Sequence, residues 1–225
     1  MGRILPTLTA QIADNPRTDW RNTIETLRRD WQERMAAETT CDSGPISPQF
    51  LVRTLQDAVD PHAVIALDVG DHFVWFARVY EARYEDVLIS GRWRSMGFGL
   101  PAAITAKLRH PERQVVAFTG DGGFAMVMAE LATVVQLCLP ITIVVVNNQV
   151  LAMELNRMVV GNYRPVGVNL HNPNFADFAR SVGCLGWRVE HPADLAPALR
   201  EALSANQPAL VDVLTANVIA PGTKV

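Results

Sequence analysis

Short apolar runs alternate with amphipathic segments from residue 48 to residue 214. The apolar runs, which have the length of strands, cover 63–68, 87–89, 114–119, 141–147, 187–190 and 209–214. The amphipathic segments, which predict helices, cover 48–59, 72–80, 100–109, 124–138, 150–158, 174–182 and 193–204. Continuous apolar strands that alternate with helices are typical of a parallel sheet buried on both faces. The sequence therefore predicts an α/β fold: a doubly wound, mostly parallel six-stranded sheet with helices on both faces.

The segment before residue 48 does not follow this alternation. Residues 19–38 form a highly charged stretch that predicts a helix, and its apolar residues near one face are Trp20, Ile24, Leu27 and Trp31. Residues 39–48 contain the Gly, Pro and Ser residues of a linker. We therefore predict two parts, with residues 1–44 separate from a single domain formed by residues 45–225.

Composition excludes several classes of function. The formal net charge is −3 and the sequence pI is about 5.9, which favours neither nucleic acid nor an anionic membrane as a partner. No apolar stretch is long enough for a transmembrane span, and the N-terminus lacks the layout of a signal peptide. The three cysteines are scattered and form no CxxC pair, which argues against a zinc site. We expect a protein of a reducing compartment, the cytoplasm.

Oxygen-bearing side chains follow three of the predicted strands. Asp71 comes after the run at 63–68, Asp121 follows the run at 114–119, and Asn147 and Asn148 lie at the end of the run at 141–147. Parallel sheets of this kind bind ligands outside the carboxyl ends of their strands. We therefore expect Asp71, Asp121 and Asn148 to gather at one edge of the sheet.

The turn Gly120-Asp121-Gly122-Gly123 predicts a phosphate site that also needs a cation. The glycines let a ligand approach backbone N–H groups at the start of a helix, whereas the carboxylate would repel a phosphate unless a divalent cation lay between them. Asn147 and Asn148 supply neutral oxygens that suit a hard cation such as Mg²⁺. The Gly-Lys-Ser/Thr of a Walker loop is absent, and "GFGLPA" at 97–102 lacks the third glycine of a dinucleotide fingerprint. Taken singly, each motif also fits an ordinary turn or strand end.

Together the motifs resemble the signature of thiamine diphosphate (ThDP) enzymes. The matching pattern is Gly120-Asp121-Gly122, then twenty-four residues, then Asn147-Asn148. The segments "DVGDHFVWFAR" (68–78), "SMGFGLPAAITAK" (95–107), "PERQVVAFTGDGGFAM" (111–126) and "ELATVVQLCLPITIVVVNN" (130–148) resemble the diphosphate-binding domain of the pyruvate oxidase and acetolactate synthase group. The segment 167–190 is most similar to pyruvate oxidases, including the quinone-linked pyruvate dehydrogenases.

The resemblance implies a set of ligands for Mg²⁺ and the diphosphate. The side chains of Asp121 and Asn148 and the backbone carbonyl of Val150 would bind Mg²⁺, with two diphosphate oxygens and a water completing an octahedron. The diphosphate itself would meet residues at two strand ends, namely Gly70, Asp71, His72, Gly120, Gly122 and Gly123. For His72, an ordinary histidine at a helix start is the alternative.

The resemblance also implies how the rest of the cofactor would be held. Met96 would wedge beneath ThDP and force a V shape that brings the pyrimidine 4′-amino group against the thiazolium C2–H. The backbone carbonyl of Arg94 would accept a hydrogen bond from that amino group, with Ser95 next to it. Leu151 and Met153 would lie beside the cofactor.

Three positions distinguish this chain within the family that it resembles. Arg94 stands where the group usually has Gly. Arg157 stands where pyruvate oxidases carry Glu and acetohydroxyacid synthases carry Trp, so it would clamp a substrate carboxylate or lie on a solvated helix face. Glu154 occupies the position of an acidic proton relay in pyruvate decarboxylases, and an ordinary surface Glu is the alternative.

The resemblance covers the C-terminal third of such enzymes and implies decarboxylation of a small 2-oxo acid, pyruvate. Residues 1–20 resemble the end of a middle domain, so we expect 1–44 to be its tail plus a linker helix, and FAD to bind only if a middle domain is supplied elsewhere. A pyrimidine-binding domain, with the Glu that protonates N1′ of the cofactor, would come from another chain or from a missing N-terminal region. Because no residue here would replace that Glu, we expect the chain by itself to be inactive toward pyruvate.

Two further functions stay open at this point. An acetolactate synthase-like carboligase is one, and a non-catalytic module that binds ThDP or only dimerises is the other. In either enzyme half of the cofactor site is a subunit interface, so we expect a homo- or hetero-oligomer. The chain should then expose an apolar surface near the cofactor, formed by Met96, Phe98, Leu100, Leu151 and Met153.

Overall fold

The computed structural model describes residues 18–41 and 44–224. Contacts divide the chain between Glu38 and Thr39 into two units. In the first unit the structure describes helix α2 (Thr18–Glu38), which confirms the helix predicted at 19–38. The apolar side chains of Trp20, Ile24 and Leu27 on α2 are exposed. The assignment of residues 1–44 to the end of a preceding domain stays a prediction.

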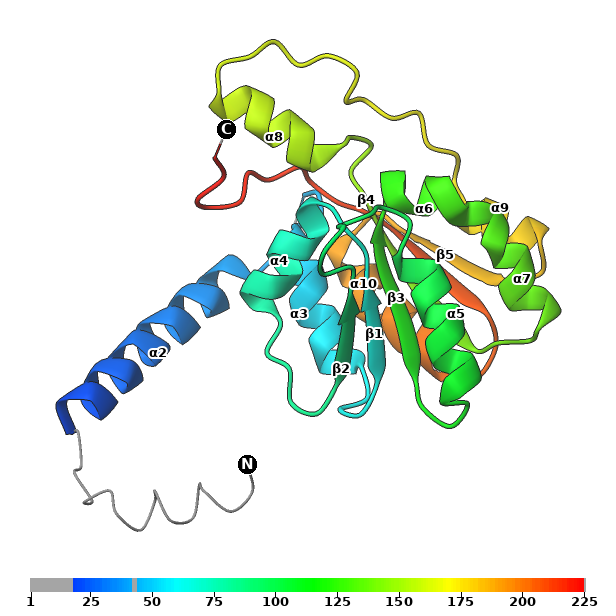
Figure 1. Ribbon diagram of the computed structural model, residues 1–225, viewed down its shortest axis with the longest axis horizontal. Coiled ribbons are helices and arrows are strands. Elements are labelled where there is room, and N and C mark those ends of the chain that lie inside the picture. The colour runs from blue at the N-terminus through cyan, green and yellow to red at the C-terminus, as the bar shows by residue number, and fades with distance from the viewer. Residues whose placement is uncertain (1–17, 42–43, 225) are drawn as a thin grey trace. The chain divides into compact units, whose positions relative to one another are not determined.

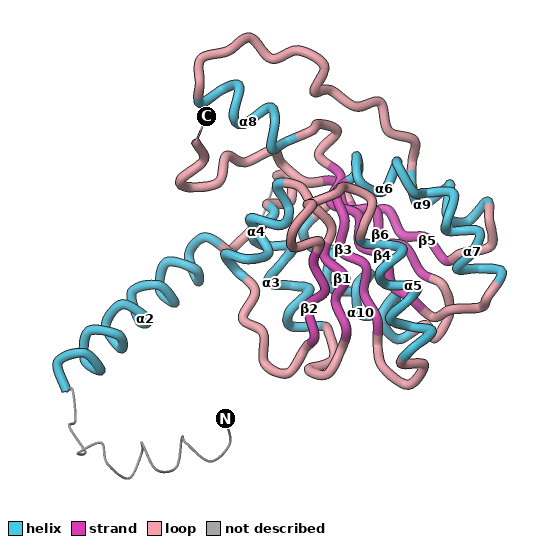
Figure 2. Tube along the Cα trace, viewed as in Figure 1, coloured by secondary structure: helices cyan, strands magenta, loops and turns pink. Residues whose placement is uncertain are grey.

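The second unit is built on a six-stranded sheet in which every neighbouring pair of strands is parallel. Its strands are β1 (Val64–Leu67), β2 (Asp86–Ile89), β3 (Val115–Gly120), β4 (Ile141–Asn147), β5 (Leu185–Val189) and β6 (Ala209–Leu214). Their order across the sheet is β2-β1-β3-β4-β6-β5, and Figure 2 shows them side by side. The predicted fold class is thus confirmed.

Helices cover both faces of the sheet, and successive residues along each inner strand are therefore buried on opposite sides. The helices of this unit are α3 (Pro48–Ala58), α4 (Asp71–Val79), α5 (Gly99–Arg109), α6 (Asp121–Val127), α7 (Leu131–Gln136), α8 (Ala152–Val160), α9 (Phe175–Ser181) and α10 (Pro192–Ser204). Val64 and Ala66 pack in the cluster beneath α5, whereas Phe118 packs against Phe76 of α4 on the other face, with the two rings tilted at 50°. Thr142 donates to the carbonyl of Ala202 in α10 at 3.2 Å. Figure 1 shows α5 in front of the strands and α3 and α10 behind them.

Most predicted boundaries are shifted by one or two residues, and three differences have a physical cause. The helix expected at 124–138 begins at Asp121 and is divided by a 3₁₀ turn, η1 (Met128–Glu130), into α6 and α7. The strand expected at 187–190 begins at Leu185, where the apolar pattern is weak, because edge strand β5 is only partly buried. In the predicted linker, Ile46 is fully buried, and its backbone forms a single parallel β-bridge with Thr215, the residue that follows β6.

The order of the strands reverses between β1 and β3, since the chain moves from β1 outward to β2 and then back across β1 to β3. Loops that leave the carboxyl ends of two strands at such a point diverge to opposite faces and leave a crevice between them. The predicted site residues after β1 and β3 are the residues that flank this crevice. Among the described residues no helix has the length and apolarity to cross a membrane.

Candidate functional site

A cavity of about 390 Å³ lies at the carboxyl ends of β1, β3 and β4. Most of the predicted site residues line it: Gly70, Asp71, His72, Arg94, Met96, Gly120, Asp121, Gly122, Gly123, Asn148, Val150, Leu151, Met153 and Glu154. The exceptions are Asn147, which is buried elsewhere, and Ser95, whose hydroxyl donates to the backbone carbonyl of Met96 at 3.2 Å. The structure therefore brings together residues that span more than eighty positions in the sequence, and their roles toward a ligand stay predictions.

Asp121, the first residue of α6, is held in one orientation by three donors. Its Oδ1 accepts the backbone N–H of Gly122 at 2.8 Å, and its Oδ2 accepts the backbone N–H of Gln149 at 2.7 Å and the side-chain amide of Asn172 at 2.8 Å. The residue is 3% exposed, and burial raises the pKa of its carboxyl. A buried carboxylate that is fixed in this way is well placed to bind a cation, since a cation offsets the cost of burying the charge.

The two asparagines after β4 differ in their surroundings. Asn148 lines the cavity, and its side-chain oxygen accepts the backbone N–H of Val150 at 3.3 Å. Asn147 is buried away from the cavity: its amide donates to Asp212 at 2.8 Å and its oxygen accepts from Asn172 at 3.0 Å. The expectation that both asparagines offer oxygens to a cation therefore needs correction, because the oxygen of Asn147 is used inside the fold.

The backbone after Asn148 is shaped by a left-handed residue and by the segment that follows α8. Gln149 has a φ of 60°, which turns the chain sharply, and its carbonyl accepts from the N–H of Leu170 at 2.8 Å. Val150 pairs with Asn169, and the N–H of Leu151 donates to the carbonyl of Val168. Residues 168–170 thus hold the carbonyl of Val150 in place from outside the sheet.

Two glycines that flank the crevice are required by the ring of His72. A Cβ added to Gly70 or Gly120 would lie 2.8 or 2.9 Å from Nδ1 of that ring. The Nε2 of His72 lies 3.1 Å from the carbonyl oxygen of Asp68, which can only accept, so Nε2 carries the proton. Burial lowers the pKa of His72 to about 4, and the neutral ring therefore has a lone pair at Nδ1. In this arrangement His72 accepts rather than donates on the cavity side, so donation to a diphosphate would require a different ring orientation.

Asp71 is used to join two helices. Its carboxylate accepts the indole N–H of Trp75 at 2.9 Å and the side-chain amide of Asn156 in α8 at 3.4 Å. Burial raises the pKa of this carboxyl as well. Asp71 lines the cavity as predicted, and the structure adds a role that its sequence position does not indicate, namely fixing α8 against α4.

Asp68, at the end of β1, organises the site and was missed by the sequence reasoning. It is fully buried, and its two oxygens accept four hydrogen bonds, from the N–H groups of Val69, Gly97 and Phe98 and from the hydroxyl of Thr119, at 2.7, 3.1, 3.3 and 2.9 Å. A Cβ at Gly123 would lie 2.9 Å from Oδ2 of Asp68. Through the N–H groups of Gly97 and Phe98, Asp68 anchors the loop at 90–98, which contains Met96 and is called the Met96 loop below. The available signal was an acidic residue inside an otherwise apolar run.

Met96 is half-buried and reaches the first turn of α6. A Cβ at Gly122 would lie 3.3 Å from Cε of Met96 and 2.9 Å from Cδ2 of Leu151. The side chains of Met96 and Leu151 thus approach Gly122 from two different loops. Met96 is thus a bulky apolar residue in the lining of the cavity, and its role beneath a cofactor stays a prediction.

Arg94 has a φ of 49°, in the left-handed region that an L-residue enters at a cost of about 1–2 kcal/mol. A glycine, which the sequence resemblance leads us to expect at this position, would adopt this φ without that cost. We predict that the free energy of unfolding of Arg94→Gly exceeds that of Arg92→Gly by about 1 kcal/mol. Both variants lose an exposed arginine and increase the conformational entropy of the unfolded chain. Only Arg94→Gly also relieves the backbone strain of a left-handed residue. Urea unfolding of the two variants tests this, and equal costs would contradict it.

Glu154 and Arg157 form an ion pair at the mouth of the cavity. Their Oε1 and Nη1 atoms are 3.6 Å apart, one turn apart on α8, and both side chains are about half exposed. An exposed pair of this kind adds little stability, typically less than about 1 kcal/mol. Both groups are thus available to a ligand that enters the cavity.

The apolar surface expected near the cavity is only partly present. Met96, Phe98, Leu151 and Met153 are partly exposed, whereas Leu100 in α5 is fully buried in the core cluster, so its inclusion was wrong. The error arises because Leu100 lies on the inner face of α5. Trp93, which the sequence analysis did not include, is 90% exposed in the loop before Met96.

The donor set fits Mg²⁺ and a diphosphate. One carboxylate, one amide oxygen and one backbone carbonyl are hard oxygen ligands, and the adjoining glycines leave room for a ligand to approach the backbone. No cluster of three or more His, Cys, Asp or Glu side chains in the described ranges 18–41 and 44–224 could hold a metal by itself. A cation here would therefore depend on oxygens that its ligand brings, as the cation of a Mg²⁺–diphosphate complex does.

Comparison with known proteins gives a family match over residues 68–213, to the thiamine pyrophosphate enzyme C-terminal TPP binding domain. YdaP of Bacillus subtilis, described as thiamine pyrophosphate-containing, is 43% identical over 189 residues, which are 83% of this chain and 33% of that protein. The acetolactate synthase of the same bacterium is 36% identical over 74% of this chain and 29% of its own length. The large subunit of Escherichia coli acetolactate synthase isozyme 1 is 32% identical over 95% of this chain and 37% of its own length. The chain thus spans about a third of these relatives, and none of the three names specifies a pyruvate oxidase.

Proposed function

Because the chain belongs to the thiamine pyrophosphate enzymes and carries their C-terminal TPP binding domain, we propose that its strand-end cavity binds Mg²⁺ and ThDP for an enzyme that decarboxylates a small 2-oxo acid, with pyruvate as the substrate. The observation that carries this proposal is the convergence of Asp121, Asn148 and Val150 on one cavity, next to Gly120 and Gly122.

Different residues of the cavity would hold different parts of the cofactor. Asp121, Asn148 and the carbonyl of Val150 would bind Mg²⁺, and the backbone at Gly122 and Gly123 would face the diphosphate. Met96 would support the rings from below, with Leu151 and Met153 beside them. When bound, ThDP supplies a nucleophilic carbon that also stabilises the electron pair left by decarboxylation, so the protein's task is to orient the cofactor and the substrate.

Arg157 and Glu154 are proposed to act on the substrate. The guanidinium of Arg157 lines the cavity mouth and suits the carboxylate of a 2-oxo acid, since arginine and carboxylate form two parallel hydrogen bonds. Glu154, 3.6 Å from Arg157, is placed to hold or deliver a proton at the same mouth. A substrate carboxylate would compete with Glu154 for Arg157 and so release Glu154 for proton transfer.

Two reaction outcomes fit this site. The oxidase-like outcome, with FAD bound in a middle domain from elsewhere, is favoured by residues 167–190. The carboligase outcome is favoured by relatives named acetolactate synthase. Product analysis with pyruvate separates them when the chain is assayed together with a pyrimidine-binding domain, because oxidation yields acetate and CO₂ whereas carboligation yields acetolactate and CO₂. A module that binds ThDP without turnover would yield neither.

A partner that carries a pyrimidine-binding domain is part of the proposal. Met96, Leu151 and Met153 line the cavity and are partly exposed. Phe98 is partly exposed and Trp93 almost fully exposed in the loop that contains Met96, which leaves apolar area for another domain to cover. That domain would supply the carboxylate for N1′ of the cofactor. We propose that it comes from a second copy or from a longer form of this chain.

ThDP should bind to this chain in a Mg²⁺-dependent manner. Calorimetric titration of ThDP is expected to give measurable heat of binding with millimolar Mg²⁺ and a loss of affinity of at least about 10-fold in EDTA, because Asp121 and the diphosphate repel each other without a cation. Thiamine without the diphosphate is the matched control and should not bind in either condition. Equal affinity for ThDP with Mg²⁺ and with EDTA would contradict the proposal.

A further inference from the structure

The segment between α8 and α9, residues 161–174, returns along the carboxyl ends of the strands (Figures 1 and 2). It contacts the candidate metal site at three points. Leu170 donates to Gln149, Val168 accepts from Leu151, and Asn172 reaches Asp121. The first two contacts are made by the backbone, whereas the third depends on one side chain.

The amide nitrogen of Asn172 bridges two buried side chains. It donates to Oδ2 of Asp121 at 2.8 Å and to the side-chain oxygen of Asn147 at 3.0 Å. Because one amide nitrogen carries two N–H groups, both bonds form at once. Oδ2 of Asp121 also accepts from the backbone of Gln149, so Asn172 supplies the only side-chain donor that the described residues give to this carboxylate.

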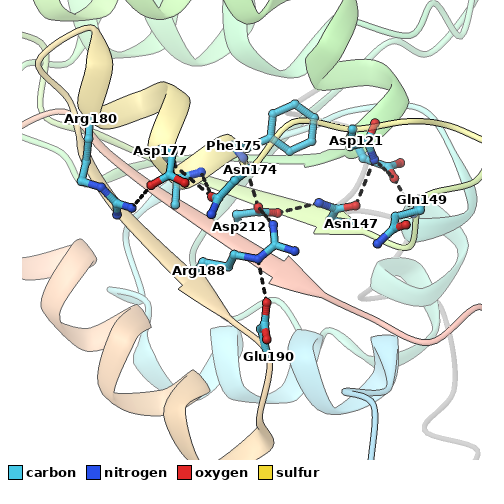
Figure 3. Close-up of polar contacts among 12 residues, drawn as sticks. Asp121, Asn147, Gln149, Asn174, Phe175, Asp177, Arg180, Arg188, Glu190 and Asp212 are labelled. Carbon is cyan, nitrogen blue, oxygen red and sulfur yellow. Dashed lines mark hydrogen bonds and ion pairs between the residues drawn. The ribbon is translucent and has the colours of Figure 1, made fainter.

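Asn147, on which Asn172 depends, is itself fixed from inside the sheet. Its amide donates to Oδ1 of Asp212, a fully buried carboxylate in β6. Oδ2 of Asp212 accepts from the backbone of Phe175 at 3.2 Å and from Nη1 of Arg188 in β5 at 2.9 Å. Figure 3 shows these side chains in line from Arg188 through Asp212 and Asn147 toward Asp121. Three strands thus share one connected polar network.

We propose that Asn172 is a positioning residue for the cation site: held by Asn147 and Asp212, it sets the orientation in which the Asp121 carboxylate meets Mg²⁺. Asn172 does not touch the cavity itself. Partners that orient a metal ligand are typically worth about 10- to 100-fold in metal affinity. This inference rests on the proposed function, since it assigns a role at the same site.

The test is the affinity of the full chain for Mn²⁺ at saturating ThDP, measured from the electron paramagnetic resonance signal of free Mn²⁺. Asn172→Ala and Asn172→Leu, of which the second keeps the approximate size of the side chain, are expected to raise the Kd of Mn²⁺ about 10- to 100-fold. Retention of the wild-type Kd by either variant would overturn the proposal. Two variants keep the test decisive if one of them folds poorly, as judged by circular dichroism.

Asn174→Ala is the matched control. Asn174 lies two residues further on and caps α9 by accepting from the N–H groups of Ala176 and Asp177. Its loss should lower the melting temperature without metal, as loss of a cap does, but leave the Kd of Mn²⁺ within about twofold. An equal loss of Mn²⁺ affinity in Asn174→Ala would mean that general destabilisation explains the effect, which overturns the positioning role. Failure of the wild-type chain to bind Mn²⁺ with ThDP would refute the proposed function instead.

Discussion

Replacement of Asp121 by alanine is expected to abolish Mg²⁺-dependent binding of ThDP, with a loss of affinity above about 100-fold. Even residues that only orient a metal ligand contribute about 10- to 100-fold, and Asp121 is the one charged protein ligand that we propose. Its removal would leave the diphosphate complex facing the amide oxygen of Asn148 and the carbonyl of Val150 alone. Calorimetric titration of ThDP in the presence of Mg²⁺ measures the effect.

The control for Asp121→Ala is Asp57→Ala, which removes an exposed carboxylate near the end of α3 that does not line the cavity. It should leave ThDP affinity unchanged. Because Asp121 accepts three hydrogen bonds, its loss also leaves three donors without their acceptor, so circular dichroism must confirm that the variant is folded. Tight binding of ThDP by a folded Asp121→Ala variant would refute the metal assignment.

Asp68→Ala is expected to lower the free energy of unfolding by about 3–5 kcal/mol, the largest stability effect that we predict. Four donors lose their acceptor in a fully buried position, and each buried polar group left without a partner costs about 1–3 kcal/mol before the structure relaxes. Urea unfolding followed by circular dichroism measures the change.

Thr119→Val provides the comparison, because it removes only one of the four donors at similar side-chain volume. It should cost about 1 kcal/mol, the usual value of a single hydrogen bond. Asp68→Ala should also weaken ThDP binding, since the N–H groups of Gly97 and Phe98 would no longer hold the Met96 loop against β1. A cost below about 1 kcal/mol for Asp68→Ala would show that the buried carboxylate does not organise the loop.

The sequence by itself determined the architecture and most of the cavity lining. Strands such as 141–147 are buried along their whole length, and this produces a continuous apolar run that indicates a parallel sheet. The glycines and oxygens after β1, β3 and β4 lie in loops whose place at one edge follows from the parallel order of the strands. For this reason local patterns were enough to predict that Asp71, Asp121 and Asn148 lie at one site.

Only the tertiary structure decided how the polar groups of that site are paired. Asn172 and Asp121 are 51 positions apart, and Asn147 and Asp212 are 65 apart. Hydrogen bonds over such separations depend on strand order and on side-chain rotamers, which leave no periodic pattern in the sequence. The inward turn of Asn147, the burial of Leu100 and the four bonds of Asp68 were out of reach for the same reason. Residue type predicts which chemistry a side chain offers, but packing of distant segments decides whether it is offered to a ligand or to the fold.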